Sequence, residues 1–262
     1  MTPAVPDSFA RTMVDIYQEE GRAWLEGLPA LIAGCAERWG LTIGPPFADL
    51  SYHYVAPAVR ADGAGVVLKL GVPNAQMRFA IAALQVYAGR HCVRLLDADP
   101  ETGIQLLEQL RPGTLLSTLL DDAKATSAAA EVMRGLWQPL PEGHPFPTVA
   151  GWAAALGRLR AHYGGGTGPL PSELFATAEG LFAELLPSSA PAVLLHGDLH
   201  HFNILAADRA PWLAIDPQGV AGEPAYEVGA LLRNPWPGLL AMPDAARVTA
   251  RRVDQLAEEL GF

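Results

Sequence analysis

Residues 193–218 read VLLHGDLHHFNILAADRAPWLAIDPQ, and they place an aspartate, an asparagine and a second aspartate in an order typical of a phosphoryl-transfer site. Asp198 follows a His-Gly pair, Asn203 comes five residues later, and Asp216 closes an apolar run at Trp212–Ile215. This order predicts a catalytic loop followed by a strand whose end binds a metal ion. The stretch therefore makes the chain a candidate enzyme.

The residue types in this stretch suit the charge of a nucleoside triphosphate. Mg²⁺ prefers oxygen ligands in octahedral geometry, and Asn203 and Asp216 can supply such oxygens. Asp198 stands apart from them, so its carboxylate can accept a hydrogen bond from an attacking hydroxyl and orient that hydroxyl toward the γ-phosphate. The sequence thus predicts one carboxylate base and two metal ligands.

Two other interpretations of the same stretch remain open. Gly-Asp and Asp-Pro pairs are common in turns and at strand ends, so the motif could consist of two ordinary turns. Alternatively, His196, His200 and His201 could form a metal cluster, because the first two are four residues apart and Asp198 is nearby. A cluster lacks support from further Cys or His residues, and the Gly-Asp pair directly after His196 favours a loop.

The motif carries a resemblance to a known family. The segments HGDLHHFNIL (196–205) and WLAIDPQGVAGEPAYEVGALLRNP (212–235) resemble the aminoglycoside phosphotransferases of the protein-kinase-like superfamily. Within it they are most similar to the streptomycin 6-kinase group, also described as aminoglycoside/hydroxyurea antibiotic resistance kinases. The likeness is densest over residues 194–236 and extends more loosely back to about Leu50.

The resemblance implies a fold and its division into parts. The expected class is α+β, a protein-kinase-like two-lobed fold with a small sheet-rich N-lobe and a larger, mostly helical C-lobe. Residues 1–110 would hold an N-terminal helix and the nucleotide-binding small lobe. Residues 111–262 would form the large lobe with the catalytic loop and the metal-binding strand.

The resemblance also implies an activity, namely transfer of the γ-phosphate of ATP, with Mg²⁺, to a hydroxyl of an aminoglycoside such as streptomycin. Asp198 would be the catalytic base, Asn203 and Asp216 the magnesium ligands, and Lys69 the lysine that reaches the nucleotide phosphates. Lys69 lies in the apolar run VVLKL, so its ammonium needs a partner or a ligand. A strand-edge lysine that extends to water is the alternative.

The stretch LLEQLRPG (106–113) reads as a strand and a turn, which in kinase-like proteins lead into the hinge between lobes. Adenine would then meet backbone groups near Glu108 and Leu110, although an ordinary strand and loop explain the stretch equally well. Ala80 stands where relatives usually carry a glutamate that orients the lysine. The chain also stops soon after a helical run at 245–260, where relatives continue, which suggests a shortened form.

Charge indicates the class of partner. The formal net charge of −10 and the pI near 5.1 disfavour nucleic acid and anionic membranes and favour a cationic small molecule. Streptomycin carries guanidinium groups, and Glu223 and Glu227 are candidate carboxylates to bind them. These glutamates could instead cap a helix at 225–232.

Two alternative functions belong to other classes. One is a kinase of another small hydroxylated acceptor, choline-like or a sugar amine, because the superfamily shares its chemical motifs. The other is a non-catalytic nucleotide-binding protein, which Ala80 suggests. The sequence does not predict an oligomeric state.

Composition agrees with an intracellular enzyme. The 262 residues are half hydrophobic, and they contain neither a stretch of transmembrane length nor a signal peptide, so the cytoplasm is the expected location. Cys35 and Cys92 are expected to be reduced core thiols. The glycine-rich run at 164–168 lacks the residues of a phosphate-binding loop and predicts a flexible connection between helices.

Hydrophobic periodicity predicts the remaining elements. A helix is expected at 7–39, where Phe9, Met13, Ile16 and Tyr17 share helical spacing, and a Pro-rich surface loop at 139–147. Strands are expected around 50–59, 66–72, 93–98 and 104–110, and further helices at 75–88, 115–121, 126–137, 149–163 and 172–186.

Overall fold

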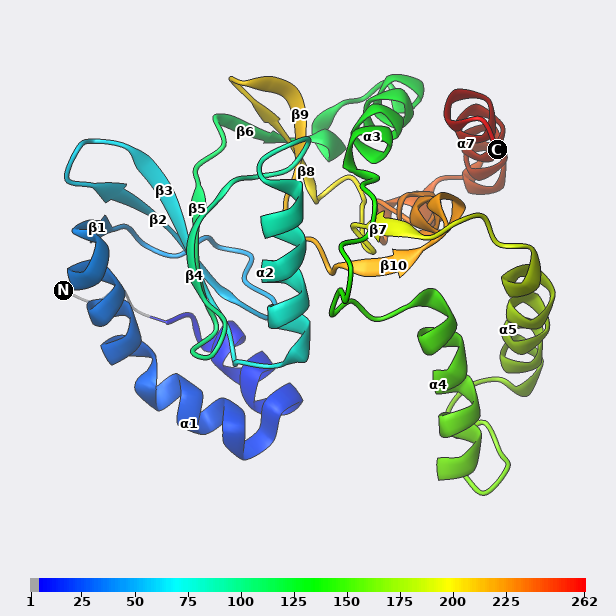
Figure 1. Ribbon diagram of the computed structural model, residues 1–262, viewed down its shortest axis with the longest axis horizontal. Helices are drawn as coiled ribbons and strands as arrows, with labels where there is room; N and C mark the ends of the chain where they lie inside the picture. The colour runs from blue at the N-terminus through cyan, green and yellow to red at the C-terminus, as the bar shows by residue number, and fades with distance from the viewer. Residues whose placement is uncertain (1–4) are drawn as a thin grey trace. The chain divides into compact units, whose positions relative to one another are not determined.

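The computed structural model describes residues 5–262, which divide into two compact units. The first unit runs to Thr114 and also takes in Ala206–Leu213, whereas the second comprises Leu115–Leu205 and Ala214–Phe262. Strands predominate in the first unit and helices in the second (Figure 1), which confirms the predicted α+β class. Sequence patterns gave no sign that residues 206–213 return to the first unit.

A five-stranded antiparallel sheet forms the centre of the first unit, in the order β1-β2-β3-β5-β4. Successive side chains of a strand point to opposite faces, so Leu68 and Leu70 face one side and Lys69 the other. The four predicted strands are present with shifted ends, and β1 was not predicted. The strands are β1 (Leu41–Ile43), β2 (Tyr54–Arg60), β3 (Gly65–Leu70), β4 (Leu95–Asp99) and β5 (Ile104–Glu108).

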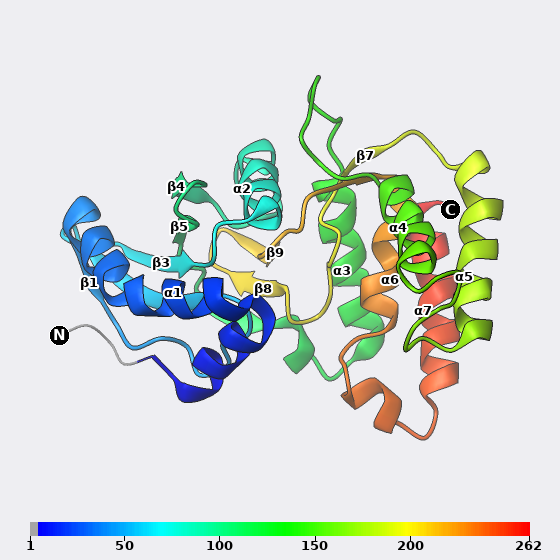
Figure 2. The same ribbon diagram turned by 90° about the horizontal axis from the view of Figure 1, so that it is seen from below.

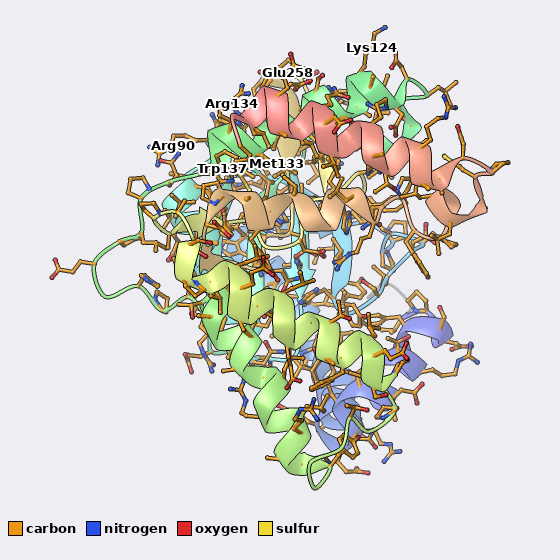
Figure 3. The ribbon with its side chains drawn as sticks, turned by 90° about the vertical axis from the view of Figure 1, so that its right-hand side faces the viewer. Arg90, Lys124, Met133, Arg134, Trp137 and Glu258 are labelled. Carbon is orange, nitrogen blue, oxygen red and sulfur yellow. The ribbon has the colours of Figure 1, made fainter. Side chains whose placement is uncertain are left out.

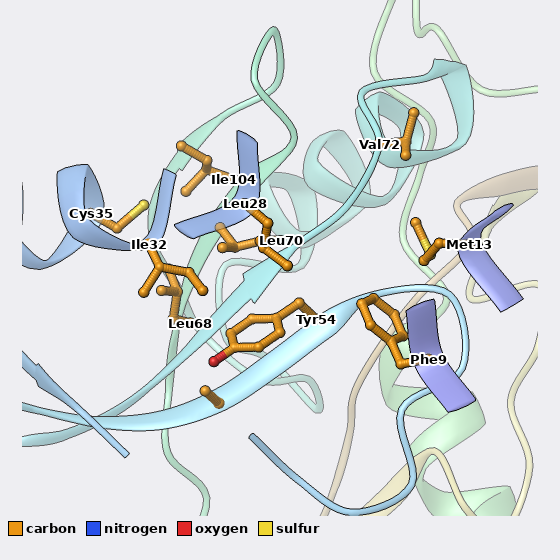
Figure 4. Packing of buried hydrophobic residues seen from close by; sticks show 11 residues of the cluster. Phe9, Met13, Leu28, Ile32, Cys35, Tyr54, Leu68, Leu70, Val72 and Ile104 are labelled. Carbon is orange, nitrogen blue, oxygen red and sulfur yellow. The ribbon is translucent and has the colours of Figure 1, made fainter. Parts of the chain in front are cut away.

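Helix α1 (Asp7–Trp39) covers one face of this sheet and has the predicted bounds. Its backbone leaves helical geometry at Gln18 (φ 52°), and it ends at Gly40 in a left-handed conformation. Ile16, two residues before that break, has 46% of its surface exposed, although it shares helical spacing with the buried Phe9 and Met13. The core beneath α1 (Figure 4) consists of Phe9, Met13, Leu28, Ile32, Cys35, Tyr54, Ala56, Leu68, Leu70, Val72 and Ile104.

Helix α2 (Ala75–Tyr87) belongs to the opposite face. It begins after Asn74, whose side chain accepts a hydrogen bond from the Met77 N–H at 2.9 Å and so satisfies a free donor of the first turn. Gln105, the register partner of Lys69, approaches the Met77 sulfur to 2.6 Å. The Lys69 face of the sheet is therefore the α2 face. Ala80 is buried on this helix.

A smaller sheet joins β6 (Pro112–Leu115), β8 (Ile204–Ala207) and β9 (Ala210–Ala214) in the order β6-β8-β9. Arg209 lies in the turn between β8 and β9 and ties this hairpin to the rest of the first unit. Its guanidinium donates to the carbonyls of Gly89 (2.8 Å) and Cys92 (2.6 Å), and its Nε lies 3.0 Å from the Glu108 carboxylate.

The second unit contains five α-helices among its described residues, and side-chain caps start two of them. Asp121 accepts from the Lys124 N–H before α3, and Thr148 accepts from the Gly151 N–H before α4. Besides β7 (Val193–Leu195) and β10 (Val220–Gly222), the unit holds α3 (Asp122–Leu136), α4 (Val149–His162), α5 (Ser172–Leu185), α6 (Val228–Leu232) and α7 (Ala245–Leu260).

The predicted helix at 115–121 is wrong. Strand β6 extends to Leu115, and only a 3₁₀ turn at Leu116–Thr118 follows before α3 begins. Leu116 is buried, but Leu120 has 98% of its surface exposed, so the segment has no continuous apolar face to hold a helix against a core. Further 3₁₀ turns occur at Leu186–Ser188, Pro224–Glu227 and Gly238–Ala241.

Helix pairs build the second unit. Helices α4 and α5 lie side by side (Figure 2), joined by the predicted glycine-rich turn and by the Arg160–Glu179 ion pair at 2.6 Å. Helix α7 packs along α3, and Figure 3 shows Arg134 of α3 close to the Glu258 end of α7. Arg252 of α7 is fully buried and donates to the carbonyls of Leu231 (3.1 Å) and Asn234 (2.5 Å).

Candidate active site

The loop at residues 196–203 follows β7, which pairs antiparallel with β10. Gly197 starts its turn at φ +85°, where a side chain is strained. A Cβ at this position would also lie 2.7 Å from the Val220 Cγ2 atom of β10. The glycine of the His-Gly-Asp motif is therefore required by the close approach of a neighbouring strand.

The His196 side chain links the Asp198 loop to Ile215, the residue before Asp216. Its ring is fully buried, and burial lowers its pKa to about 4, so the ring is neutral at pH 7. The Nε2 atom lies 2.8 Å from the Ile215 carbonyl, and Nδ1 lies 3.2 Å from the Asp198 backbone nitrogen. Because a carbonyl only accepts and an amide N–H only donates, Nε2 carries the proton. The ring thereby connects the Asp198 loop to the end of β9.

Asp198 presents an ionised carboxylate. Its Oδ1 lies 3.0 Å from the Arg233 guanidinium, and its Oδ2 lies 3.6 Å from Nε2 of His200. Burial alone would raise the pKa of this carboxyl, but the neighbouring His200 and the positive charge of Arg233 outweigh burial and hold the pKa below its usual value. A carboxylate in this state can accept a hydrogen bond from a hydroxyl.

The amide of Asn203 has a defined orientation. Its Nδ2 donates to the Asp198 carbonyl at 2.9 Å, which leaves the Oδ1 lone pairs as the atoms that a cation could use. The Asn203 carbonyl accepts from the Ile215 N–H at 2.9 Å, so Asn203 lies beside the residue that precedes Asp216. Asp216 itself adopts a left-handed backbone conformation with φ +59°. The loop and the end of β9 thus bring Asp198, Asn203 and Asp216 into one neighbourhood.

Glu227 lies under the loop rather than on a surface. It is 1% exposed, and its two carboxylate oxygens accept from the backbone N–H groups of His196 (2.6 Å) and Gly197 (2.9 Å). Complete burial raises the pKa of this carboxyl to about 7, although the backbone donors act in the opposite direction. This placement identifies Glu227 as a support for the loop that carries Asp198. Glu223, by contrast, is half-buried and accepts from the Ala190 N–H at 3.1 Å.

A cavity of about 280 Å³ opens beside this loop. Gly197 and Arg233 line it together with residues 225–230, among them Tyr226 and Glu227. Arg233 also contacts Asp198, so a small molecule in the cavity would lie beside the loop at residues 196–203. This volume is just below the range of about 300–1,000 Å³ that is typical of small-ligand sites.

The remaining predicted site residues belong to the first unit. Lys69 is 5% exposed on β3. The Glu108 carboxylate accepts from the Arg94 N–H and pairs with Arg209, and the Glu108 N–H donates to the Arg94 carbonyl at 3.0 Å. Leu110 follows the end of β5. The Glu108 side chain and backbone N–H are therefore already engaged in contacts within the first unit.

The structure does not gather the three histidines into a metal site. Within residues 5–262, no group of three or more His, Cys, Asp or Glu side chains is arranged to hold an ion. His201 points instead toward Arg252, whose Nη2 lies 3.5 Å from its Nε2.

Across residues 5–262, no helix has the length and apolar character needed to cross a bilayer. Cys35 and Cys92 are buried, as predicted, and neither forms a disulfide within the described residues.

Sequence reasoning missed Arg233 and expected a different role for Glu227. Arg233 contacts the Asp198 carboxylate across 35 positions of sequence, and Glu227 reaches the loop across about 30. Arginine in the segment LLRNP was part of the family resemblance, but its position alone gives no sign that it reaches Asp198. Glu227 was predicted from its charge and position to contact a cationic substrate, and only the folded chain shows that its carboxylate accepts from the backbone of the loop.

We expect the free energy of unfolding to fall as the pH drops from about 6.5 to 4. The folded-state pKa values of His196 and His201, both about 4, lie below the ordinary 6.5, so the unfolded chain takes up these protons first. Glu227 opposes this trend, because its folded-state pKa of about 7 exceeds the ordinary 4.5. The two histidines lower the free energy of unfolding and the one glutamate raises it, each by a similar amount. The net decrease in the free energy of unfolding is therefore on the order of 3 kcal/mol.

Urea unfolding at about pH 7, 5.5 and 4.5 measures this loss. His201→Gln should show a smaller decline than the wild type, because one of the two titrating rings is gone. His162→Gln, at an exposed position on α4, serves as the matched control. Equal declines in the wild type and His201→Gln would contradict the assignment.

Sequence comparison gives several relatives. Residues 41–262 match the family described as aminoglycoside/hydroxyurea antibiotic resistance kinase. The chain is similar to streptomycin 6-kinase of Streptomyces glaucescens, with 36% identity over 98% of this chain and 84% of the relative. It is also similar to hydroxyurea phosphotransferase of Kitasatospora aureofaciens, with 38% identity over 82% of this chain and 63% of the relative.

Solved structures share the fold. The aminoglycoside phosphotransferase APH(3'')-Id from Streptomyces rimosus, in complex with ADP and streptomycin, aligns with a TM-score of 0.56 and 21% identity over 90% of this chain and 92% of that one. Choline kinase LicA from Streptococcus pneumoniae aligns with a TM-score of 0.61 and 13% identity over 87% of this chain and 80% of its own. These likenesses confirm the predicted protein-kinase-like fold.

Proposed function

Because the chain belongs to the aminoglycoside/hydroxyurea antibiotic resistance kinase family, we propose that it transfers the γ-phosphate of ATP to a hydroxyl of an aminoglycoside, with streptomycin as the acceptor. The observation that carries this proposal is the Asp198 carboxylate, which lies 3.0 Å from Arg233 and 3.6 Å from His200 beside a cavity of about 280 Å³. Relatives named streptomycin 6-kinase, 36% identical over nearly the whole chain, support the acceptor.

Asp198 acts as the base in this proposal. Its carboxylate accepts the proton of the acceptor hydroxyl while the hydroxyl oxygen bonds to the γ-phosphorus, and ADP leaves. His196 keeps the Asp198 backbone in place through its Nδ1, and Glu227 holds the preceding two residues through their N–H groups. Positioning of this kind supplies much of the catalysis in phosphoryl transfer.

Asn203 and Asp216 would hold magnesium. The orientation of the Asn203 amide fits this role, because its nitrogen is engaged by the Asp198 carbonyl and its oxygen is the donor that a hard cation requires. When bound, the ion would supply charge neutralisation for the nucleotide phosphates. Asp216 would provide the second oxygen ligand at the end of β9.

The nucleotide is assigned to residues 1–110. Lys69, on the α2 face of the sheet, would contact the phosphates, and adenine would contact the backbone near Glu108 and Leu110. Because the Glu108 N–H is already bonded to Arg94, Leu110 is the better candidate donor to adenine. ATP is proposed as the nucleotide, on the basis of the family and of a solved relative that contains ADP.

The acceptor is proposed to be a cationic small molecule. The half-buried Glu223 remains a candidate to contact its positive groups. Glu227 lines the cavity but is 1% exposed, so we assign it to supporting the loop in place of binding substrate. The cytoplasm is the proposed location, as the composition predicts.

ADP release by the purified chain tests the proposal. The assay uses Mg-ATP alone and with streptomycin, hydroxyurea, choline or other aminoglycosides, and mass spectrometry of the product locates the phosphate. We expect release that depends on streptomycin. Hydroxyurea is the second candidate, because a hydroxyurea phosphotransferase is 38% identical over 82% of the chain. Mg-ATP binding without release on any acceptor would favour a non-catalytic nucleotide-binding protein.

A further inference from the structure

The two oxygens of the Asp198 carboxylate have unequal neighbours. His200, at 3.6 Å from Oδ2, has a side chain that is 16% exposed, and its Nδ1 also accepts from the Phe202 N–H at 3.2 Å. Arg233, at 3.0 Å from Oδ1, has a side chain that is 67% exposed. The histidine is therefore fixed by its surroundings, whereas the arginine is free to exchange its contact for water or for another ligand.

Arg233 also stands at the cavity. It follows directly after α6 and lines the cavity together with Gly197, the residue before Asp198. A molecule in the cavity would thus meet the guanidinium and the catalytic loop together. A second positive group brought to this place would repel Arg233 and compete with it for the same carboxylate.

We propose that Arg233 guards the catalytic carboxylate: its guanidinium occupies Oδ1 of Asp198 and is displaced when a cationic acceptor enters the cavity. This inference rests on the proposed function and deepens it, since it makes positive charge on the acceptor a condition for access to Asp198. The acceptor hydroxyl then takes the position at Oδ1 that Arg233 has left.

Replacement of Arg233 by the acceptor hydroxyl at Asp198 is consistent with the chemistry of phosphoryl transfer. The bond from the acceptor oxygen to the γ-phosphorus forms, the bond from that phosphorus to the bridging oxygen of ADP breaks, and the hydroxyl proton passes to Asp198. A carboxylate oxygen that is paired with a guanidinium is a weaker proton acceptor than a free one. Water carries no positive charge with which to displace Arg233, so the guard would also limit hydrolysis of ATP in the absence of acceptor.

Arg233→Gln and Arg233→Lys test the guard, with Arg247→Gln as the matched control, because Arg247 forms an exposed ion pair with Asp244 within one helical turn. Calorimetry with streptomycin in the absence of nucleotide gives the first readout. We expect about three- to ten-fold tighter binding by Arg233→Gln, little change for Arg233→Lys, and none for the control. Unchanged or weaker binding by Arg233→Gln would overturn the inference.

The second readout is ADP release from Mg-ATP without acceptor, which should rise several-fold in Arg233→Gln because Asp198 is then open to water. A residue with a purely structural role would not raise this rate. If Arg233 instead stabilises the transferring phosphoryl group, kcat with streptomycin will fall about 100-fold or more and the guard is excluded. A wild type that releases no ADP with any acceptor refutes the proposed function, whereas the calorimetric comparison still decides the role of Arg233.

Discussion

Asp198→Asn is expected to lower the acceptor-dependent release of ADP by about 10²–10⁴-fold. The substituted amide matches the carboxyl in shape but cannot accept a proton at neutral pH. The backbone contacts of residue 198 with His196 and Asn203 do not involve its side chain, so the loop should keep its structure. Steady-state assays with saturating streptomycin and Mg-ATP measure the loss.

The same variant should bind Mg-ATP with nearly the affinity of the wild type, because the residues proposed for the metal and the phosphates are unchanged. Asp208→Asn is the matched control, since Asp208 is an exposed aspartate in the turn that follows β8. Turnover at the wild-type rate in Asp198→Asn would remove Asp198 as the base. Loss of nucleotide binding as well would assign the residue to ligand binding.

Glu227→Ala is expected to lower the free energy of unfolding by about 2–5 kcal/mol and to reduce transfer strongly. The carboxylate accepts from the N–H groups of His196 and Gly197 in the interior, so its removal leaves two buried donors without acceptors. The affected residues directly precede Asp198, and a small displacement of a catalytic group costs much of the rate.

Urea unfolding and steady-state kinetics on the same preparations measure both effects. Glu227→Gln should lose less, about 1–3 kcal/mol, because one oxygen still accepts while the amide nitrogen cannot. Glu131→Ala, at an exposed position on α3, is the control. If Glu227→Ala keeps the stability of the wild type but fails to bind streptomycin, the residue contacts the acceptor and does not support the loop.

Much of the fold could be predicted from local patterns. The helix at 7–39 and the regions of α2, α3, α4 and α5 follow from apolar residues at helical spacing. The same reasoning failed at 115–121, where apolar residues occur but Leu120 is exposed and the segment has no continuous apolar face to pack against a core. It also missed β1, because three residues are too few to show a period.

For the site, the spacing within residues 196–216 predicted which residues lie near Asp198. His196, Asn203 and Asp216 are close to Asp198 along the chain, so short loops and one hairpin suffice to bring them together. The individual roles assigned to them remain predictions until the variants are measured.

The sequence by itself determined the α+β class, the boundaries of the long helices, the family and the catalytic-loop motif. Each of these depends on residues that are neighbours along the chain, where helix and strand periods and turn chemistry dictate local conformation. Tertiary structure alone decided that Glu227 supports the loop, that Arg233 occupies Asp198, and that Arg209 ties residues 206–213 to the first unit. Such contacts join side chains about 30 to 120 residues apart, and their formation depends on how whole elements pack, which no local period encodes.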